Sequence, residues 1–315
     1  MKYYIAHHQH KGRPFELALR REGWRLAINN PDVALFDHAI NREKPEEERA
    51  LVKKYYDEGS TILTYPHGAT GTWWMDNDMY QTDDKLSGNL VIGEGHKHIE
   101  EIVQPTLKHY VTGWNFCPIE EFKKPKEVVN ILFAPIHAAQ RTNNFRDEAI
   151  ETNARVFEAL LKLPSKYKII IRYLNPLNTI GLKNVSRVIL RPGKPDGSYS
   201  EIDFADVVIA EGTYMYLSVA RGKPTIGMNQ HIPPRPNGYG FKEFKLKHWN
   251  EYERYLAYPI DFYDGDDLLG LINRAVKEEQ SEWKRLFIGD KMSSTYLSKL
   301  LIDIRNGKEC YETHH

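Results

Sequence analysis

Short apolar runs alternate with helical patterns along the chain. Runs rich in β-branched and aromatic residues at Tyr3–Ala6, Val33–Phe36 and Thr61–Tyr65 end at turns, and helix-forming stretches follow the first two. The second half repeats this style, because the continuous apolar run Val128–Ala134 suits a strand buried on both faces and precedes a long helix at Phe145–Leu163. Strands that alternate with helices indicate βαβ units and mainly parallel sheets. The expected fold class is therefore α/β.

The same criteria predict the remaining elements. Further strands are expected at Trp24–Ile28, Asn89–Ile92, Tyr167–Arg172, Val185–Leu190 and Asp206–Ala210. Further helices are expected at Phe15–Glu22, Asn41–Asp57, His96–Lys108 and in one or two segments of Gln280–Asn306.

A second α/β domain is expected, and with it two Rossmann-like domains, because the second half of the chain predicts a sheet of its own. The boundary should fall within Asn115–Glu127, where Pro118 and the charged run after it break the periodicity. We predict a first domain over residues 1–118, a second over 128–285, and terminal helices over 286–315 that pack back. Two such domains leave a cleft at the carboxyl ends of their strands, where α/β sheets bind ligands.

Composition narrows the possible functions. The 315 residues contain 43 basic and 43 acidic side chains, so a chain-wide attraction to nucleic acid or to an anionic membrane is excluded, although a local basic patch is not. Cys117 and Cys310 are too few for a disulfide framework or a cysteine-based zinc site. No apolar run approaches the roughly 18 residues of a membrane span, and the N-terminus lacks the layout of a signal peptide. We therefore expect a soluble, cytoplasmic protein.

The most informative stretch covers residues 205–228. A buried strand is expected to end at Ala210, before the turn Glu211-Gly212-Thr213 and a helix. Gly212 permits close approach of a ligand to the backbone, and Thr213 is a candidate helix cap beside N–H groups that face an anion. A plain strand–turn–helix junction is the alternative interpretation.

The order strand, small-residue turn, helix, Gly-Lys-Pro, strand resembles the donor-nucleotide half of GT-B glycosyltransferases. The similarity is to the CDP-glycerol glycerophosphotransferase group, the UDP-GlcNAc 2-epimerases and lipid A disaccharide synthase. Four other stretches resemble further parts of these enzymes in the same order: Tyr65–Gly68, His109–Trp114, Ile131–His137 and Phe287–Tyr296. The resemblance implies an acceptor-side first domain and a donor-binding second domain. It also implies transfer of a sugar, or a similar group, from a nucleotide-activated donor to a hydroxyl acceptor, without a metal or other cofactor.

The donor side gains further candidates from the loop before the long helix. Thr142 and Asn143 are natural N-caps whose neighbouring amides could meet a phosphate, although capping alone also explains them. Arg141 or Arg172 could neutralise the leaving nucleotide diphosphate, since arginine offers a bidentate fork.

One position departs from the family pattern. Many GT-B enzymes carry a glutamate on the helix after the phosphate turn, where it holds the donor ribose, but this chain has Leu217 there, next to Ser218. Either the ribose is held from elsewhere, or the donor is unusual, or donor binding has been lost. Glu211 would repel donor phosphates unless a cation, a proton or a sugar hydroxyl compensates its charge.

On the acceptor side, His67 follows a predicted strand and its ordinary pKa suits abstraction of a hydroxyl proton. Asp37, at the end of another strand, is the rival base. His7, His8 and His10, with Arg13, suggest a polar acceptor loop rather than a zinc site, because no carboxylate lies at ligand spacing.

Residues 233–258 form a long segment in which aromatic side chains alternate with basic ones, a pattern that can stack bases or sugars. A loop packed over the domain edge is the simpler interpretation. The acceptor thus stays open among glycan, lipid, small molecule and nucleic acid, including a modified DNA base. Two other functions remain: a 2-epimerase of nucleotide sugars, and a non-catalytic protein that binds a glycan or nucleic acid.

Overall fold

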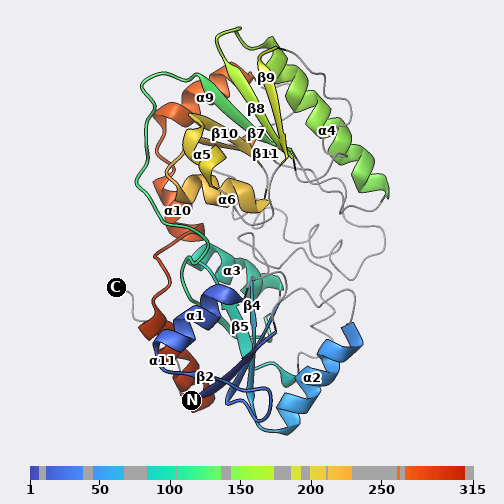
Figure 1. The fold of residues 1–315 in the computed structure, drawn as a ribbon, viewed down its shortest axis with the longest axis vertical. Helices are drawn as coiled ribbons and strands as arrows, with labels where there is room; N and C mark the ends of the chain where they lie inside the picture. Colours follow the sequence, from blue (N-terminus) through green and yellow to red (C-terminus); the bar gives the residue numbers. More distant parts are fainter. Residues whose placement is uncertain are drawn as a thin grey trace. The chain divides into compact units, whose positions relative to one another are not determined.

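The computed structural model describes residues 1–6, 12–37, 45–66, 84–103, 105–135, 143–173, 186–192, 199–210, 212–228, 261–262 and 267–308. These residues form two compact units (Figure 1). Unit 1 contains the described residues of 1–116 and 285–308, and unit 2 contains those of 117–228 and 261–284. The chain passes back into unit 1 within helix α10 (Ser281–Phe287).

Unit 1 is a parallel sheet of six described strands with helices on both faces. The sheet has the order β2-β1-β3-β4-β5-β6. Its strands are β1 (Lys2–Ile5), β2 (Arg25–Leu26), β3 (Val33–Asp37), β4 (Thr61–Tyr65), β5 (Gly88–Val91) and β6 (His109–Val111). Its helices are α1 (Arg13–Arg21), α2 (Pro45–Asp57), α3 (Glu94–Val103) and α11 (Ser294–Arg305).

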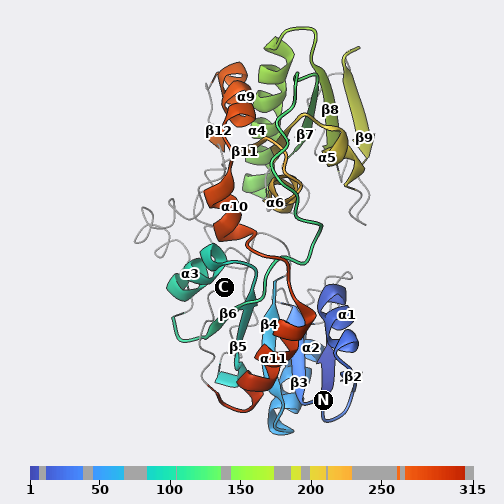
Figure 2. The ribbon, with the colours of Figure 1, turned by 90° about the vertical axis from the view of Figure 1, so that its left-hand side faces the viewer.

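The core of unit 1 has one cluster on each face of its sheet. Helices α1 and α11 lie side by side (Figure 2), and Leu19 and Leu301 pack with Leu63 on that face. On the other face, Tyr55 of α2 packs with Phe36. Side chains alternate between faces along a strand, so one strand serves both clusters. The C-terminal helix is thus an integral layer of the N-terminal unit.

Unit 2 repeats the architecture with a different strand order, β12-β11-β10-β7-β8-β9. Its strands are β7 (Asn130–Ala134), β8 (Lys168–Tyr173), β9 (Val188–Pro192), β10 (Val207–Ala210), β11 (Thr225–Met228) and β12 (Asp261–Phe262). Its helices are α4 (Asn143–Lys162), α5 (Ser200–Phe204), α6 (Gly212–Ala220) and α9 (Leu268–Lys277).

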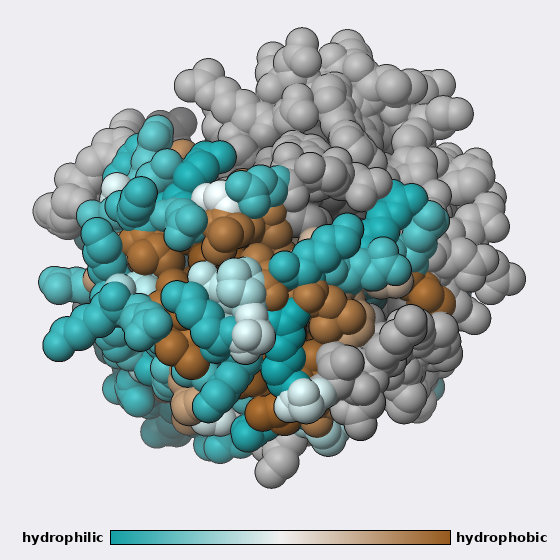
Figure 3. All heavy atoms as spheres, turned by 90° about the horizontal axis from the view of Figure 1, so that it is seen from above, coloured by the Kyte–Doolittle hydropathy of each residue, from teal (hydrophilic) through white to brown (hydrophobic). Residues whose placement is uncertain are grey.

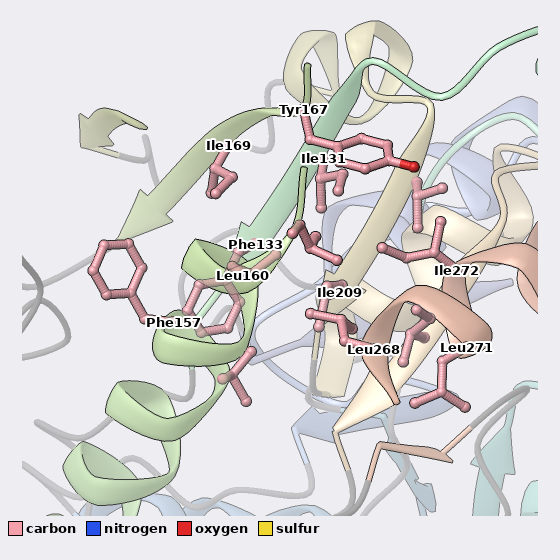
Figure 4. Close-up of a cluster of buried hydrophobic side chains, with 14 of the residues drawn as sticks. Ile131, Phe133, Phe157, Leu160, Tyr167, Ile169, Ile209, Leu268, Leu271 and Ile272 are labelled. Carbon is pink, nitrogen blue, oxygen red and sulfur yellow. The ribbon is translucent and has the colours of Figure 1, made fainter. Parts of the chain in front are cut away.

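Helices α4 and α9 share one face of the unit 2 sheet. Figure 4 shows Leu160 of α4 and Ile272 of α9 beside the strand side chains Ile131, Phe133 and Ile209. All five are at most 2% exposed, so this cluster is a dry core. Helices α5 and α6 contact β7, β10 and β11 from the other side. The sheet is therefore doubly wound.

The sequence-based boundaries differ from the structure in places that have physical causes. Helix α3 ends at Val103 rather than at Lys108, because Pro105 disfavours helix in the residue before it. The strand expected at Trp24–Ile28 is reduced to Arg25–Leu26 at the sheet edge. Four elements of the structure have no counterpart among the predicted ones: β6, α5, β12 and α9.

The described surface mixes polar and apolar side chains. Figure 3 shows brown hydrophobic groups scattered between teal hydrophilic ones on the face seen from above. Single exposed apolar residues, such as Ile28 at 67% exposure, are usual on protein surfaces. Within the described residues, no helix is both long and apolar enough to cross a membrane.

Candidate functional site

The strand order of unit 2 defines where a ligand would bind its sheet. Counted along the chain, its strands have the order 3-2-1-4-5-6 of dinucleotide-binding sheets, in which the connections change sides between strands 1 and 4. Those strands are β7 and β10, which pair in register from Val207 with Ile131 to Ala210 with Ala134. Open α/β sheets bind ligands outside the carboxyl ends of these two strands. The predicted turn at Gly212 follows one of them directly.

Gly212 has a conformational role in this turn. Its φ is 62°, in the left-handed region that costs other residues about 1–2 kcal/mol. Helix α6 begins at Gly212, so Thr213 lies inside the first turn instead of at the expected cap position. The turn therefore presents backbone amides at the start of a helix, where an anion is stabilised. Glu211 lies outside the described residues.

The position that departs from the GT-B pattern is in the interior of unit 2. Leu217 is 7% exposed and Ser218 is fully buried. The Ser218 hydroxyl donates to the carbonyl oxygen of Tyr214 at 2.8 Å. Neither side chain is therefore available to a ribose in this arrangement, and a ribose contact would have to come from another element.

Arg172, at the carboxyl end of β8, belongs to a buried cluster. Its Nε donates to Oε2 of Glu201 on α5 at 2.9 Å, and these side chains are 7% and 14% exposed. Its guanidinium carbon lies 4.5 Å from the ring centroid of Tyr214 on α6. The Tyr214 hydroxyl is 3.4 Å from the same Glu201 oxygen. Burial is the main cause that raises the pKa of Tyr214, so this phenol stays neutral at physiological pH.

The remaining donor-side candidates lie around the start of α4. This helix begins at Asn143, after the loop that follows β7. Asn143 is therefore the first residue within the helix rather than the residue that caps it, and Arg141 and Thr142 lie outside the described residues.

The Gly-Lys-Pro motif has a structural role that the sequence did not reveal. Gly222 has a φ of +69°, and a Cβ there would overlap the carbonyl oxygen of Glu121. The N–H of Glu120 donates to Ala220 at 2.8 Å, and the N–H of Lys123 donates to Gly222 at 2.8 Å. The segment that enters unit 2 is thus bound directly to the motif, and only glycine allows this close approach.

Charged side chains extend this attachment. Arg221 forms two hydrogen bonds of 3.0 Å with the carboxylate of Asp203 and an ion pair with Glu120. The Lys223 ammonium donates to the carbonyl oxygens of Asp203 at 2.7 Å and Ala205 at 2.9 Å, which satisfies the end of α5. Burial is the main cause that lowers the pKa of Lys223.

In unit 1, the strand order places the carboxyl ends of β1, β3 and β4 side by side at one sheet edge. The connections change sides between β1 and β3, and β4 lies next to β3. Asp37 ends β3, is fully buried and pairs in register with Tyr65, whose hydroxyl donates to Ala6 at 2.6 Å. His67 comes two residues after Tyr65. His67, His7 and His10 lie outside the described residues, and Arg13 is exposed at the start of α1.

Sequence reasoning missed two titratable residues on α3. His96 and Glu100 are 1% and 0% exposed, and residues four apart share one helix face. The His96 ring lies 5.3 Å from the ring of Phe287. Helix α3 starts just after β5, at the same edge as Asp37. The four-residue spacing of a histidine and a glutamate in a predicted helix was the available signal. Among the described residues, no group of three potential ligands could hold a metal ion.

Several solved structures are similar to this chain. The glycosyltransferase SnogD from Streptomyces nogalater is 11% identical with a TM-score of 0.51, over 96% of this chain and 98% of SnogD. The lipopolysaccharide outer core galactosyltransferase WaaB is 12% identical with a TM-score of 0.47, over 92% of this chain and 78% of WaaB. TarM is 14% identical with a TM-score of 0.49, over 87% of this chain and 54% of TarM, so the chain spans about half of TarM.

No protein-family model and no curated protein matches the sequence. The similarity to SnogD extends over both units and confirms the predicted GT-B fold, with two Rossmann-like domains. The similarity to particular GT-B groups, and the cleft between the domains, stay predictions.

Proposed function

We propose that this chain is a GT-B glycosyltransferase that moves a sugar, or a similar group, from a nucleotide-activated donor to a hydroxyl acceptor. The observation that carries the proposal is the left-handed glycine turn at the start of α6, which follows β10 at the change of connection side in the unit 2 sheet. A nucleotide diphosphate suits this position because backbone amides and a helix N-terminus stabilise negative charge there.

On the donor side, the turn Glu211-Gly212-Thr213 and the start of α4 at Thr142 and Asn143 hold the phosphates. As the acceptor oxygen bonds to the anomeric carbon, the bond from that carbon to the diphosphate oxygen breaks, and negative charge develops on the leaving group. Amide groups fixed before the reaction, together with Arg141, stabilise that charge and take the place of a metal ion.

On the acceptor side, a base removes the hydroxyl proton. We propose His67 for this role and keep Asp37 as its rival. The complete burial of Asp37 favours His67, because a general base must reach the proton that it abstracts. A carboxylate next to His67 would stabilise the protonated imidazole that forms when His67 takes the proton. His7, His10 and Arg13 would then contact the acceptor.

A thermal-shift experiment with a panel of nucleoside mono- and diphosphates tests the donor. A product nucleotide at 100 times its Kd should stabilise the protein by about 2.7 kcal/mol, because it binds only the folded state. The Gly212→Val variant is the control, and its weaker binding should reduce the stabilisation to about 0.4 kcal/mol at the same nucleotide concentration. If no nucleotide stabilises the wild-type protein, the glycosyltransferase proposal is wrong.

The acceptor class needs a separate experiment. If residues 233–258 contact a nucleic-acid acceptor, DNA binding should weaken steeply as salt rises, since each phosphate contact releases counterions. Binding that is absent, or that does not depend on salt, would remove nucleic acid and leave a glycan, a lipid or a small molecule as the acceptor.

A further inference from the structure

We infer that Tyr214 is a positioning residue for the phosphate-facing turn, and that Arg172 acts through Tyr214 rather than as a ligand of the leaving group. This inference rests on the proposed function. It changes the role that the sequence suggested for Arg172, because the structure gives this arginine other partners.

The first argument is the place of Tyr214 in α6. Tyr214 is the third residue of the helix and comes two residues after Gly212, so its side chain is attached to the turn itself. The left-handed glycine gives this turn more backbone freedom than any other residue would. A side chain fixed at the third position removes that freedom and sets the direction of the first amide groups.

The second argument is how Tyr214 is held. One face of its ring is covered by the Arg172 guanidinium, whose carbon is 4.5 Å from the ring centroid, a distance typical of cation–π contact. Its hydroxyl lies 3.4 Å from Glu201. The turn is thereby connected to β8 and to α5.

The third argument is charge. The Nε of Arg172 donates to Glu201 at 2.9 Å, and both side chains are largely buried. If Arg172 turned toward a diphosphate, it would leave the Glu201 carboxylate buried without its counter-charge, which is unfavourable. It would also uncover the ring of Tyr214. The arrangement therefore favours an Arg172 that holds Tyr214 in place over an Arg172 that moves to bind the diphosphate.

The test is a double-mutant cycle on the affinity for a nucleoside diphosphate, measured by calorimetry. One arm removes the ion pair as Arg172→Met with Glu201→Gln, so that no buried charge is left alone. The other arm is Tyr214→Leu, which keeps apolar volume and removes the ring. Tyr214→Phe is the matched control, since it keeps the ring under the guanidinium.

We expect each arm to weaken binding about tenfold and the combination to weaken it no further, because both arms act on one element. The affinity for the nucleoside without phosphates should stay unchanged, which a general loss of structure would not produce. Additive effects of about 100-fold in the combined variant would show that Arg172 touches the phosphates directly, and would overturn the inference.

Hydrogen exchange in the ligand-free protein separates this inference from the proposed function. The amides of residues 216–218, which donate to the carbonyls of the first helical residues, should exchange faster in both arms than in the wild type, and Tyr214→Phe, which loses only the hydroxyl contact with Glu201, should be affected less than either arm. Unchanged exchange in both arms would overturn the positioning role even if nucleotides bind. Faster exchange in a protein that binds no nucleoside diphosphate would contradict only the proposed function.

Discussion

The carboxyl edges of the two sheets carry different chemistry. In unit 1, Asp37 ends a strand at this edge, and the helix that follows β5 adds the titratable side chains His96 and Glu100. In unit 2, the strands beside the change of connection side end in Ala134 and Ala210, and Gly212 follows. One edge therefore supplies groups that can exchange a proton, and the other supplies backbone amides that can bind an anion.

The strand orders decide which strand ends meet at each edge. In unit 1 the connections change sides between β1 and β3, and in unit 2 between β7 and β10. The change lies between the first and third strands of unit 1 but between the first and fourth strands of unit 2, so different loops meet at the two edges. The comparison teaches that repeating a βαβ architecture fixes where a site forms, whereas the local residues decide its chemistry.

The largest expected effect concerns the proton-transfer edge. His67→Ala should lower turnover by roughly 10²–10⁴-fold, because general base catalysis contributes about that much, while donor affinity stays nearly intact. Asp37→Asn is the matched variant for the rival base. Steady-state kinetics of both variants is the measurement. Full activity in both would show that unit 1 does not supply the base, and the contrast between the edges would fail.

The next effect concerns the anion-binding edge. Gly212→Val should weaken nucleotide binding by about 100-fold, since hydrogen bonds to a charged group contribute roughly 1.5–3 kcal/mol each. The left-handed φ of 62° means that valine also strains the turn, by about 1–2 kcal/mol of unfolding free energy. Calorimetric titration beside a melting curve measures both. Wild-type affinity in the folded variant would mean that the donor binds elsewhere.

A smaller effect tests the attachment of the linker to unit 2. Gly222→Ala should lower the free energy of unfolding by about 2–4 kcal/mol, because the left-handed backbone is strained and the Cβ overlaps Glu121. Gly59→Ala is the control, since Gly59 has a φ of +77° but no atom within 4 Å of an added Cβ. Denaturant unfolding compares them. Equal destabilisation would show that the linker contact contributes nothing.

The smallest effect concerns alkaline pH in unit 1. Burial, followed by the charges of Tyr4 and Glu58, raises the pKa of Tyr55 from 10.0 to about 12. The folded state favours the protonated phenol, which donates to Ile28 at 2.9 Å. This stabilisation is complete below pH 10 and is lost as the pH rises from 10 toward 12.

Tyr55→Phe should therefore lose less unfolding free energy than the wild type over that range, although it is about 1 kcal/mol less stable at neutral pH. Tyr56→Phe, at an exposed neighbouring position, should follow the wild type. Denaturant unfolding at several pH values measures the free energy of unfolding. The same dependence of this free energy on pH in Tyr55→Phe and in the wild type would contradict the assignment to Tyr55.

Much of the fold could be predicted from local patterns. The strand at Thr61–Tyr65 agrees with the structure residue for residue, because it is apolar and bounded by turn residues. Helix α9 was missed although its signals are present: Asp267 accepts from the N–H of Leu269 as an N-cap, and apolar residues recur at helical spacing. The five-residue helix α5 is too short for any period to emerge.

The sequence by itself determined the α/β class, the approximate elements and the turn at Gly212, since these follow from interactions among residues close in the chain. Only the tertiary structure decided which strands are neighbours, that Arg172 pairs with Glu201 at a separation of 29 residues, and that Gly222 contacts Glu121. Those contacts join distant segments, and their free energy depends on burial and packing that no local pattern encodes.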